Sequence, residues 1–345
     1  MVRNPLALSA GMPYHAGYTR TCQEIANSQI RSREVLKKPW MADITLLLVA
    51  FIWGSTFLIV QQAIASLPPN SFNAVRFTIA ALFLFLLQII LYRKQWKEWR
   101  GPLLVSGAIL GFWLCLGYAL QTVGLLYTTP SKAGFITGLS VVLVPLFSFL
   151  ILRDRVKPAA IVGVIMAAFG LYLLTQNQSF TFNLGDALVF GCAICFAMQI
   201  VITGKYAPRF PALPLAIIQL FTVALLSWAY AFLFEDYQRA FDPAILLIPE
   251  VAFGLFITSI FATALAFLAQ TALQKQTSST RVALIFALEP VFAALTSYVF
   301  IHEVLSGRQL VGCLLIFVGM ILAELPIKEW LENAKQRKQN QKHSA

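Results

Sequence analysis

Charged residues are scarce in this sequence. Asp, Glu, Lys and Arg make up 12% of its 345 residues, about half of their share in a typical soluble domain, whereas 59% of the residues are hydrophobic. A soluble protein of this size needs much more charged surface to cover its core. The composition therefore excludes an ordinary soluble enzyme.

Histidine and cysteine, the usual residues of metal and redox sites, are also few. His15, His302 and His343 lie in the tails or in a turn and form no ligand set. The five cysteines are odd in number, and Cys192 and Cys195 lie inside an apolar segment with no second pair or histidine nearby. The chain also lacks a phosphate-binding glycine loop, so ATP hydrolysis is not expected as its energy source. We therefore expect no cofactor, no metal site and no disulfide framework.

Long apolar segments, by contrast, are abundant. Each is close to the roughly 20 residues that a helix needs to cross about 30 Å of hydrocarbon. Apolar and polar residues do not alternate in them, as they do in the strands of a membrane barrel, so the segments are predicted to be helices. The sequence thus predicts an all-α integral membrane protein with ten transmembrane helices, approximately at residues 44–66, 71–92, 102–126, 132–152, 158–175, 185–204, 212–234, 250–273, 280–301 and 308–325.

Lys and Arg are distributed unevenly among the connecting loops. With the N-terminus inside, the inner loops hold eleven of these residues and the outer loops hold three. The positive-inside rule therefore predicts a multi-pass protein of the cell membrane with both termini in the cytoplasm. The formal charge of +11 belongs to these loops and to the tails, so no nucleic-acid partner is expected.

Both ends of the chain lie outside the helical pattern. Residues 1–40 are polar and mixed, with no apolar core of a cleavable signal peptide. They are either a cytoplasmic tail or sequence upstream of a true translation start at Met41, and we slightly favour the second interpretation. Residues 327–345 are expected to form a charged cytoplasmic tail.

The two halves of the apolar region, residues 41–178 and 179–326, resemble each other. Each half has five predicted helices, and this odd number makes the second half insert upside down relative to the first. Inverted repeats are typical of transporters that alternate access around a site near the bilayer midplane, where the repeats meet. The matching pairs include, at an offset of 149, Gln121 and Gln270, Thr128 and Thr277, Lys132 and Arg281, Leu139 and Leu288, Gly163 and Gly312, and Gly170 and Gly319, and, at an offset of 143, Asp43 and Asp186.

Two charged side chains, Arg76 and Glu289, lie well inside the predicted helices, where a charge costs roughly 2.5–3.5 kcal/mol. Glu289 lies about 13 Å into its helix, near the midplane, followed by Pro290, which frees a carbonyl of the preceding turn. Because burial disfavours a charged carboxyl, Glu289 is expected to exchange a proton or to bind a substrate amine; the alternative is a structural, hydrogen-bonded acid. Arg76 lies about 8 Å from the outer end of its helix. It either binds an anion or gates access to the site, or its long side chain extends outward to the interface in a structural role.

Aromatic and neutral polar residues complete the candidate substrate site. Trp53 lies near the middle of the first predicted helix, beside Gly54. It either forms an aromatic wall for a substrate or packs against other helices. Ser140 occupies the place of Glu289 in the first half, at the offset of 149. The neutral polar candidates, which either line a cavity or join helices by hydrogen bonds, are Tyr118, Gln199, Gln121, Gln219 and Gln270. For Gln121 and Gln270 a structural role is favoured, because they lie near helix ends.

Glycines recur at spacings that place them on one face of a helix, where they permit close helix packing. These glycines are Gly107 and Gly111, Gly134 and Gly138, Gly163 and Gly170, and Gly312 and Gly319.

Several short motifs lie in the apolar region. They are Trp-Gly-Ser-Thr-Phe at residues 53–57, Arg-Phe at 76–77, Glu-Pro-Val-Phe at 289–292, and His-Glu at 302–303 followed by Gln309, Gly312 and Gly319. With these motifs the chain resembles the drug/metabolite transporter superfamily, specifically its EamA type with two tandem five-helix units. The resemblance covers residues 41 to about 325.

This resemblance implies a secondary active exporter of small organic solutes, such as amino acids, related metabolites or toxic compounds, rather than an enzyme. With the inverted repeats it indicates alternating access, with a small-molecule substrate, protons and the lipid bilayer as partners. One alternative is a nucleotide-sugar or sugar-phosphate exchanger, although Arg76 is the only buried basic residue to meet a phosphate. An alternative of another class is an intramembrane lipid-modifying enzyme, although no clustered acids, histidines or metal ligands lie near an interface.

Overall fold

The computed structural model describes residues 39–154, 156–175, 183–301 and 306–324. The predicted tails, apart from residues 39 and 40, and the motif at residues 302–303 lie outside these ranges. The chain divides into two compact units, residues 1–44 and residues 45–345. Everything described below, except the first turns of helix α2, belongs to the second unit.

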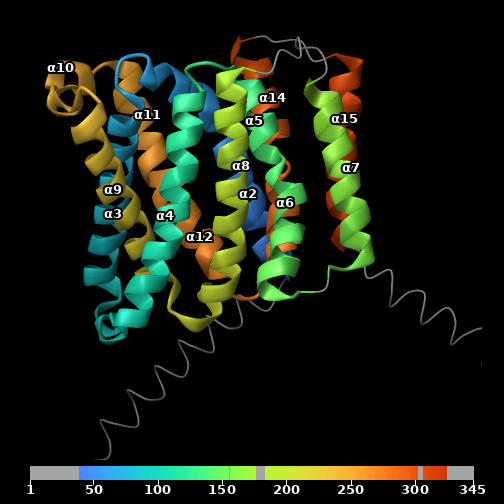
Figure 1. Ribbon diagram of the computed structural model, residues 1–345, viewed down its shortest axis with the longest axis horizontal. Helices are drawn as coiled ribbons and strands as arrows, with labels where there is room; N and C mark the ends of the chain where they lie inside the picture. The colour runs from blue at the N-terminus through green and yellow to red at the C-terminus, as the bar shows by residue number, and fades with distance from the viewer. Residues whose placement is uncertain (1–38, 155, 176–182, 302–305, 325–345) are drawn as a thin grey trace, which may run out of the picture. The chain divides into compact units, whose positions relative to one another are not determined.

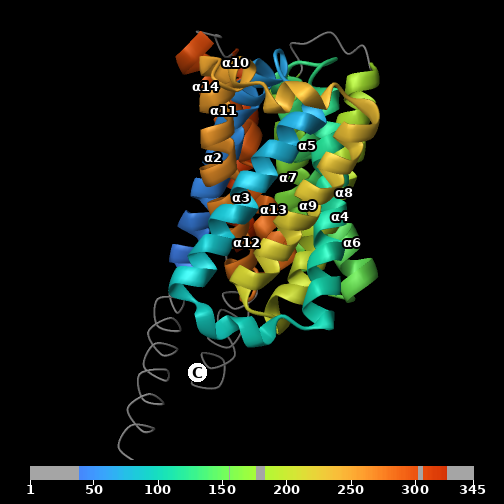
Figure 2. The same cartoon turned by 90° about the vertical axis from the view of Figure 1, so that its left-hand side faces the viewer.

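Helices are the only regular elements in the described part of the chain, and in the second unit they run side by side (Figure 1, Figure 2). The α-helices are α2 (Pro39–Ile64), α3 (Pro69–Leu91), α4 (Gly101–Gly124), α5 (Pro130–Gly138), α6 (Ser140–Phe147), α7 (Pro158–Thr175), α8 (Leu184–Tyr206), α9 (Ala212–Phe234), α10 (Pro243–Leu246), α11 (Pro249–Ser259), α12 (Ala266–Leu273), α13 (Ser279–Phe286), α14 (Glu289–Ile301) and α15 (Gly307–Glu324). Three short 3-10 helices, η1 (Arg93–Glu98), η3 (Ala207–Arg209) and η4 (Tyr237–Phe241), and two π-helical turns, η2 (Ser148–Leu152) and η5 (Ile260–Leu265), complete the set.

Eight helical stretches of 21 to 26 residues are long and apolar enough to cross a membrane. The apolar helices at the fifth and tenth predicted positions are shorter, covering Pro158–Leu173 and Gly307–Leu322. The complete helices have 18 residues each, and at 1.5 Å per residue they extend about 27 Å, less than the roughly 30 Å of a hydrocarbon core. The described residues thus give an all-helical, multi-pass membrane protein with eight spans by length, where the sequence predicts ten.

The two shorter helices, α7 and α15, pack along each other through glycines. A Cβ atom added to Gly170 would lie 2.6 Å from the carbonyl oxygen of Gly312, and one added to Gly319 would lie 2.8 Å from that of Gly163. The offset of 149 exchanges these two contacts, because it relates Gly163 to Gly312 and Gly170 to Gly319. The α7–α15 pair therefore has the contact pattern of a two-fold axis between the repeats.

The other predicted packing glycines lie against different neighbours. A Cβ atom on Gly107 would lie 2.6 Å from Ile218 Cγ2, and one on Gly111 would lie 2.5 Å from Thr222 Cβ, so both permit the close packing of α4 on α9. Gly134 has looser surroundings, with its nearest neighbour 3.7 Å away on the Phe57 ring.

Two of the predicted membrane helices are interrupted. The fourth is divided into α5 and α6 at Leu139, and the ninth into α13 and α14 at Ala287 and Leu288. In the ninth, Pro290 lacks the N–H group that would continue the helical hydrogen bonds across the break. The two breaks touch, because a Cβ atom on Gly138 would lie 3.0 Å from Pro290 Cγ.

A π-helical turn, η5, interrupts the eighth predicted helix between α11 and α12. Such a turn contains one extra residue and leaves backbone groups free for other partners, which is why π-turns are frequent at functional sites. As described below, two residues of η5 hold side chains of the candidate site.

Candidate functional site

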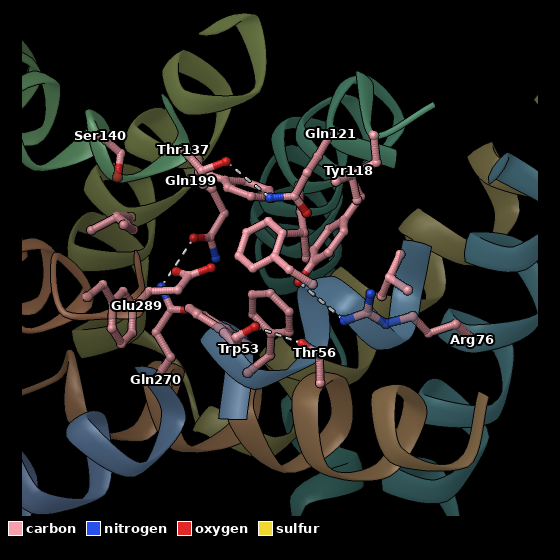
Figure 3. Close-up of a pocket in the computed structure, with 18 residues that line it drawn as sticks. Trp53, Thr56, Arg76, Tyr118, Gln121, Thr137, Ser140, Gln199, Gln270 and Glu289 are labelled. Carbon is pink, nitrogen blue, oxygen red and sulfur yellow. Dashed lines mark hydrogen bonds between the residues drawn. The ribbon is translucent and has the colours of Figure 1, made fainter. Parts of the chain in front are cut away.

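A small cavity lies beside the two helix breaks. Its volume is about 50 Å³, enough for a few water molecules. Its walls come from α2, α3, α4, α5, α6, α8, α12, α13 and α14, so both halves of the sequence contribute (Figure 3). The lining residues are Trp53, Thr56, Phe57, Val60, Arg76, Leu114, Tyr118, Gln121, Leu125, Thr137, Ser140, Phe196, Gln199, Ile200, Phe267, Gln270, Phe286 and Glu289.

All six residues that the sequence predicts for substrate binding or coupling line this cavity. They are Glu289, Arg76, Trp53, Tyr118, Gln199 and Ser140. Gln121 and Gln270, for which the sequence favours a structural role, also lie in the wall, whereas Gln219 is buried in α9 away from it. The fold thus brings to one place residues that are up to 236 positions apart in the chain.

The wall is built largely from residue pairs that the repeat relates. Fourteen of its eighteen residues form seven such pairs. The pairs are Trp53 and Phe196, Thr56 and Gln199, and Phe57 and Ile200 at the offset of 143, and Tyr118 and Phe267, Gln121 and Gln270, Thr137 and Phe286, and Ser140 and Glu289 at the offset of 149. Each pair has one residue from the first half of the chain and one from the second. The cavity is therefore where the two halves meet.

Glu289 is the first residue of α14, and Ser140 is the first residue of α6. The N-terminal ends of both half-helices thus border the cavity, and such ends favour negative charge. Glu289 is half-buried, and within the described residues its carboxylate makes no hydrogen bond or ion pair. Both carboxylate oxygens are consequently available to a ligand or a proton.

Gly54 brings α2 against the start of α14. A Cβ atom at this position would overlap the carbonyl oxygen of Glu289 and would lie 2.8 Å from the Cβ atom of Phe292. Because the obstructing oxygen belongs to the backbone, any larger residue at position 54 would push α14 away and displace Glu289 with it.

Arg76 points into the bundle rather than outward, so of the two alternatives left open by the sequence its side chain does not adopt the snorkelling one. Only 3% of the residue is exposed, and its Nε donates a hydrogen bond of 2.7 Å to Thr263 Oγ1. Its Nη2 donates to the Tyr118 hydroxyl at 3.4 Å, and the guanidinium carbon lies 4.7 Å from the centre of the Tyr118 ring. No carboxylate pairs with Arg76 in the described part of the chain. Neutral hydroxyls and a ring face hold the cation in place without neutralising it.

Trp53 is held by the π-helical turn η5. Its indole Nε1 donates a 2.7 Å hydrogen bond to the carbonyl oxygen of Ala262, and its ring contacts Phe267 and Phe286 at centroid distances of 5.3 and 4.8 Å. The neighbouring residue Thr263 accepts the hydrogen bond from Arg76. One irregular turn thus positions both Trp53 and Arg76. Sequence reasoning missed Ala262 and Thr263, because the residue types of η5 do not signal a π-turn.

The amides of the wall form a second polar group. Gln270 Nε2 lies 3.1 Å from Gln199 Oε1, and Gln121 Nε2 lies 3.3 Å from Thr137 Oγ1. The Oε1 atom of Gln270 is buried without a hydrogen-bond partner within the described residues. A buried amide oxygen without a partner favours a ligand that donates a hydrogen bond.

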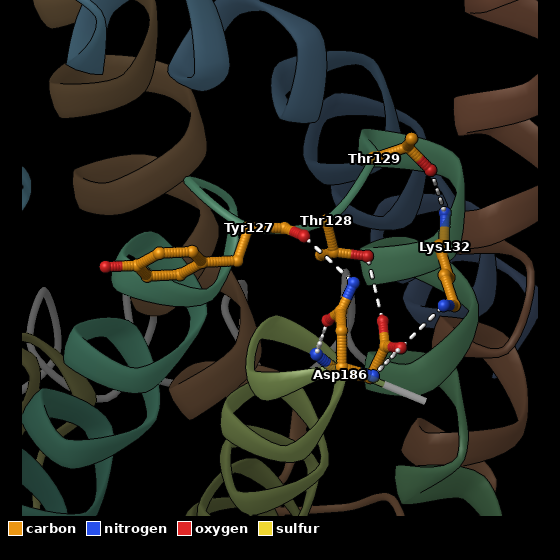
Figure 4. A network of polar contacts seen from close by, with 6 residues as sticks. Tyr127, Thr128, Thr129, Lys132 and Asp186 are labelled. Atoms are coloured by element: carbon orange, nitrogen blue, oxygen red, sulfur yellow. Dashed lines mark hydrogen bonds and ion pairs between the residues drawn. The ribbon is translucent and has the colours of Figure 1, made fainter. Parts of the chain in front are cut away.

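Asp186 anchors a separate polar network at the start of α8 (Figure 4). Its carboxylate accepts hydrogen bonds from Thr128 Oγ1 at 2.9 Å and from Lys132 Nζ at 2.5 Å, and it completes a capping box with Asn183. Although Asp186 lies at the edge of a predicted helix, its side chain is fully buried. Sequence reasoning recorded only the repeat pairing of Asp186 and missed this network, which ties the start of α5 to the start of α8.

Comparison with known proteins identifies the family. The EamA-like transporter family matches residues 40–176 and again residues 183–325. The chain belongs to the EamA-like transporter family. An uncharacterized transporter of Archaeoglobus fulgidus is 37% identical over 286 residues, covering 83% of this chain and 86% of the relative.

More distant relatives agree with this assignment. The uncharacterized transporter YvbV of Bacillus subtilis is 27% identical and covers 82% of this chain and 92% of its own. The protein PagO of Salmonella typhimurium is 24% identical, with 83% and 94% covered. A crystal structure that is 22% identical in sequence has the same fold, with a TM-score of 0.69 over 84% of this chain and 98% of its own. The chain is thus a multi-pass membrane transporter with a small-molecule substrate.

Proposed function

We propose that this protein is a secondary active exporter of small organic solutes, such as amino acids, related metabolites or toxic compounds. The observation that carries the proposal is the central cavity, whose wall is formed by repeat-related pairs and contains one cation, Arg76, and one carboxylate, Glu289. The two charged groups lie on opposite sides of the cavity in Figure 3. Aromatic rings and neutral amides occupy the space between them, which suits a solute with both polar and apolar parts.

Alternating access is the mechanism that this arrangement supports. Drug-sized solutes occupy pockets of about 300–1,000 Å³, whereas this cavity has about 50 Å³. The cavity is therefore smaller than such a solute, and in alternating access the wall moves to admit one. The two helix breaks and the π-turn η5 provide irregular backbone next to that wall, where helix segments can change direction.

Topology belongs to the same proposal. We assign ten spans as two inverted repeats, residues 41–178 and 179–326, with α7 and α15 as the fifth span of each and both termini in the cytoplasm of the cell. The positive charge of the inner loops supports this assignment. In a cysteine-free variant, Gln238→Cys is expected to react with an impermeant thiol reagent applied outside, and Lys97→Cys only after permeabilisation. The reverse pattern would overturn the orientation.

In this mechanism the charged groups have distinct roles. Glu289 exchanges a proton or binds a substrate amine, and Arg76 binds an anionic group of the substrate. Tyr118, Gln199, Ser140 and Trp53 contact the solute. A sugar-phosphate or nucleotide-sugar exchanger is the second candidate, but Arg76 is the only basic residue among the cavity-lining residues. A lipid-modifying enzyme would need a reactive cluster that the described wall does not contain.

The deciding experiment measures efflux. Cells that lack the protein, cells that overproduce it, and cells that overproduce the Arg76→Gln, Glu289→Gln double variant are compared for solutes in the medium by mass spectrometry. We expect one class of amine- or carboxylate-bearing solutes to accumulate outside only with the wild-type protein. The same solute concentrations in the media of all three strains, with the wild-type protein and the double variant equally abundant in the membrane, would contradict the proposal. Accumulation of phosphorylated sugars in the medium would favour the exchanger.

A further inference from the structure

A second and larger cavity lies on the flank of the bundle between α3, α9 and the start of α4. Its volume is about 650 Å³. Among its lining residues, Leu82, Phe221 and Leu225 are more than half exposed, so the cavity is a groove open to the surface. Apart from Thr78 and the indole N–H groups of Trp99 and Trp228, its walls are apolar, and Thr78 already accepts a hydrogen bond from Trp228 Nε1 at 3.0 Å. The groove therefore favours a hydrocarbon chain.

The groove has the length of one bilayer leaflet. Along α9 it extends from Ile217 to Trp228, which is about 16 Å at 1.5 Å per residue. The hydrocarbon core of a bilayer is about 30 Å thick, so each leaflet contributes about half of it. One end of the groove is at Trp99, next to the loop between α3 and α4.

Basic and aromatic residues gather at this end. The short helix η1 is joined to the groove by Phe85, whose ring contacts Trp96 and Trp99 at centroid distances of 5.5 and 6.5 Å. Arg93, Lys97 and Arg100 are exposed in and beside η1, with Glu98 as the one acid of the same segment. Exposed basic side chains beside tryptophan are typical of the level of lipid headgroups.

The indole of Trp99 adds a specific donor. Trp99 lines the groove, and its Nε1 atom is buried without a hydrogen-bond partner in the described part of the chain. A buried N–H group without a partner is costly, and an acceptor oxygen at the mouth of the groove would satisfy it. A phospholipid provides such oxygens in its ester and phosphate groups.

We propose that the groove is a binding site for an anionic phospholipid. One acyl chain occupies the groove between α3 and α9, and the phosphate lies at η1, paired with Arg93 and Arg100 and accepting the hydrogen bond of Trp99. Arg93 keeps terminal nitrogens for this role, because only its Nε donates to the backbone, at 2.8 Å from Ile89 O. The site is separate from the central cavity, with which it shares no lining residue.

Native mass spectrometry of the purified full-length protein tests the proposal. Phosphatidylglycerol and phosphatidylcholine with identical acyl chains are titrated in parallel. We expect preferential binding of phosphatidylglycerol, weakened about 30-fold in the Arg93→Gln, Arg100→Gln variant and about fivefold in Trp99→Phe. The matched control, Arg153→Gln with Lys157→Gln, removes two exposed charges from another inner loop and should leave binding unchanged.

Leu82→Trp tests the groove itself and does not depend on the charge variants. It fills the groove without changing any charge, and binding of both lipids should fall. Equal affinity of the wild-type protein for the two lipids would overturn the proposal, as would unchanged binding in Leu82→Trp. Competition by free glycerol phosphate at the strength of the whole lipid would show an anion site without the groove. A dimer of the chain that Leu82→Trp dissociates would assign the groove to a second copy.

Discussion

The break between α5 and α6 can be compared directly with the break between α13 and α14. Leu139 and Ala287, which follow the last residues of α5 and α13, have almost the same backbone angles, with φ at −61° and −62° and ψ at −14° and −13°, although the offset of 149 pairs Leu139 with the next residue, Leu288. The next half-helix, however, begins with a hydroxyl at Ser140 in the first repeat and with a carboxylate at Glu289 in the second. The backbone is repeated while the chemistry is not.

The same contrast extends to the rest of the wall. Arg76 lines the cavity, whereas its counterpart Gln219, at the offset of 143, is buried away from it. Tyr118 donates or accepts through a hydroxyl that its counterpart Phe267 lacks. Each repeat therefore contributes one charged group to the cavity, the cation from the first and the carboxylate from the second. A substrate with two ends can be oriented by such a wall even though the same family model matches both halves of the chain.

Removing the carboxylate should have the largest effect. Glu289→Gln keeps the shape of the side chain and makes the wall as uncharged at the second break as it is at the first. Because the amide cannot release a proton, efflux driven by a pH gradient should fall at least about tenfold, while exchange of substrate without a gradient continues. The measurement uses proteoliposomes with the variant and the wild type at equal abundance.

The control for this prediction is Glu250→Gln, which neutralises an exposed acid at the start of α11 and should transport as the wild type does. Gradient-driven efflux of wild-type size in Glu289→Gln would rule out the coupling role. The double variant Ser140→Glu, Glu289→Ser moves the acid to the other repeat, and recovery of coupling there would show that position in the repeat is unimportant.

Removing the cation should have the second-largest effect. Arg76→Gln gives the first repeat the residue found at the related position of the second. Loss of hydrogen bonds from a charged group costs about 1.5–3 kcal/mol, so KM for carboxylate-bearing solutes should rise about 10- to 100-fold. Solutes that carry only an amine should be transported as before, and Lys275→Gln should change neither class. An equal rise in KM for both classes of solute would contradict the assignment of Arg76 to an anionic group.

The symmetric glycine contacts predict equal effects in the two repeats. Gly170→Ala and Gly319→Ala each place a Cβ atom less than 3 Å from a carbonyl oxygen of the partner helix. Both should destabilise the protein by about 1–3 kcal/mol, measured as thermal stability in detergent. Gly134→Ala, whose nearest neighbour is 3.7 Å away, is the matched control and should change little. A large effect of Gly170→Ala alone would mean that the two repeats do not share the α7–α15 contact equally.

Much of this architecture follows from the sequence, because apolar length and the offset of 149 are properties of the residues themselves. Arg76 and Glu289 are predicted because a charge inside a membrane helix is costly, and Ser140 because the repeat relates it to Glu289. Trp53 is predicted from its depth in the helix, and Tyr118 and Gln199 from their polarity. The break at Pro290 is also readable, since proline removes a backbone donor. The break at Leu139 has no proline and could not be predicted in the same way.

Other features depend on tertiary packing and leave no local signal. The π-turn η5 is defined by hydrogen bonds five residues apart, which its apolar sequence does not specify. The direction of Arg76 depends on Thr263, a residue 187 positions away in the chain. The burial of Asp186 depends on Lys132 and Thr128, which lie in the other repeat. Partners so distant become apparent only once the helices are packed.

The smallest predicted effect concerns the support of the cation by the π-turn. Thr263→Val keeps the shape of the side chain but removes the acceptor of the 2.7 Å hydrogen bond from Arg76 Nε. A hydrogen bond from a charged group contributes about 1.5–3 kcal/mol. Because Tyr118 still holds the guanidinium in the variant, only part of this is lost to substrate binding, and KM for carboxylate-bearing solutes should rise about fivefold. Thr258→Val, a buried threonine of the preceding helix α11 that bonds only to the carbonyl of Gly254, is the control. If Thr263 acts through Arg76, its substitution should have no further effect in the Arg76→Gln background, and a double-mutant cycle measures this directly. If Thr263→Val still raised KM fivefold in the Arg76→Gln background, Thr263 would act by contacting the substrate or by supporting the packing of the helices, and not through the cation.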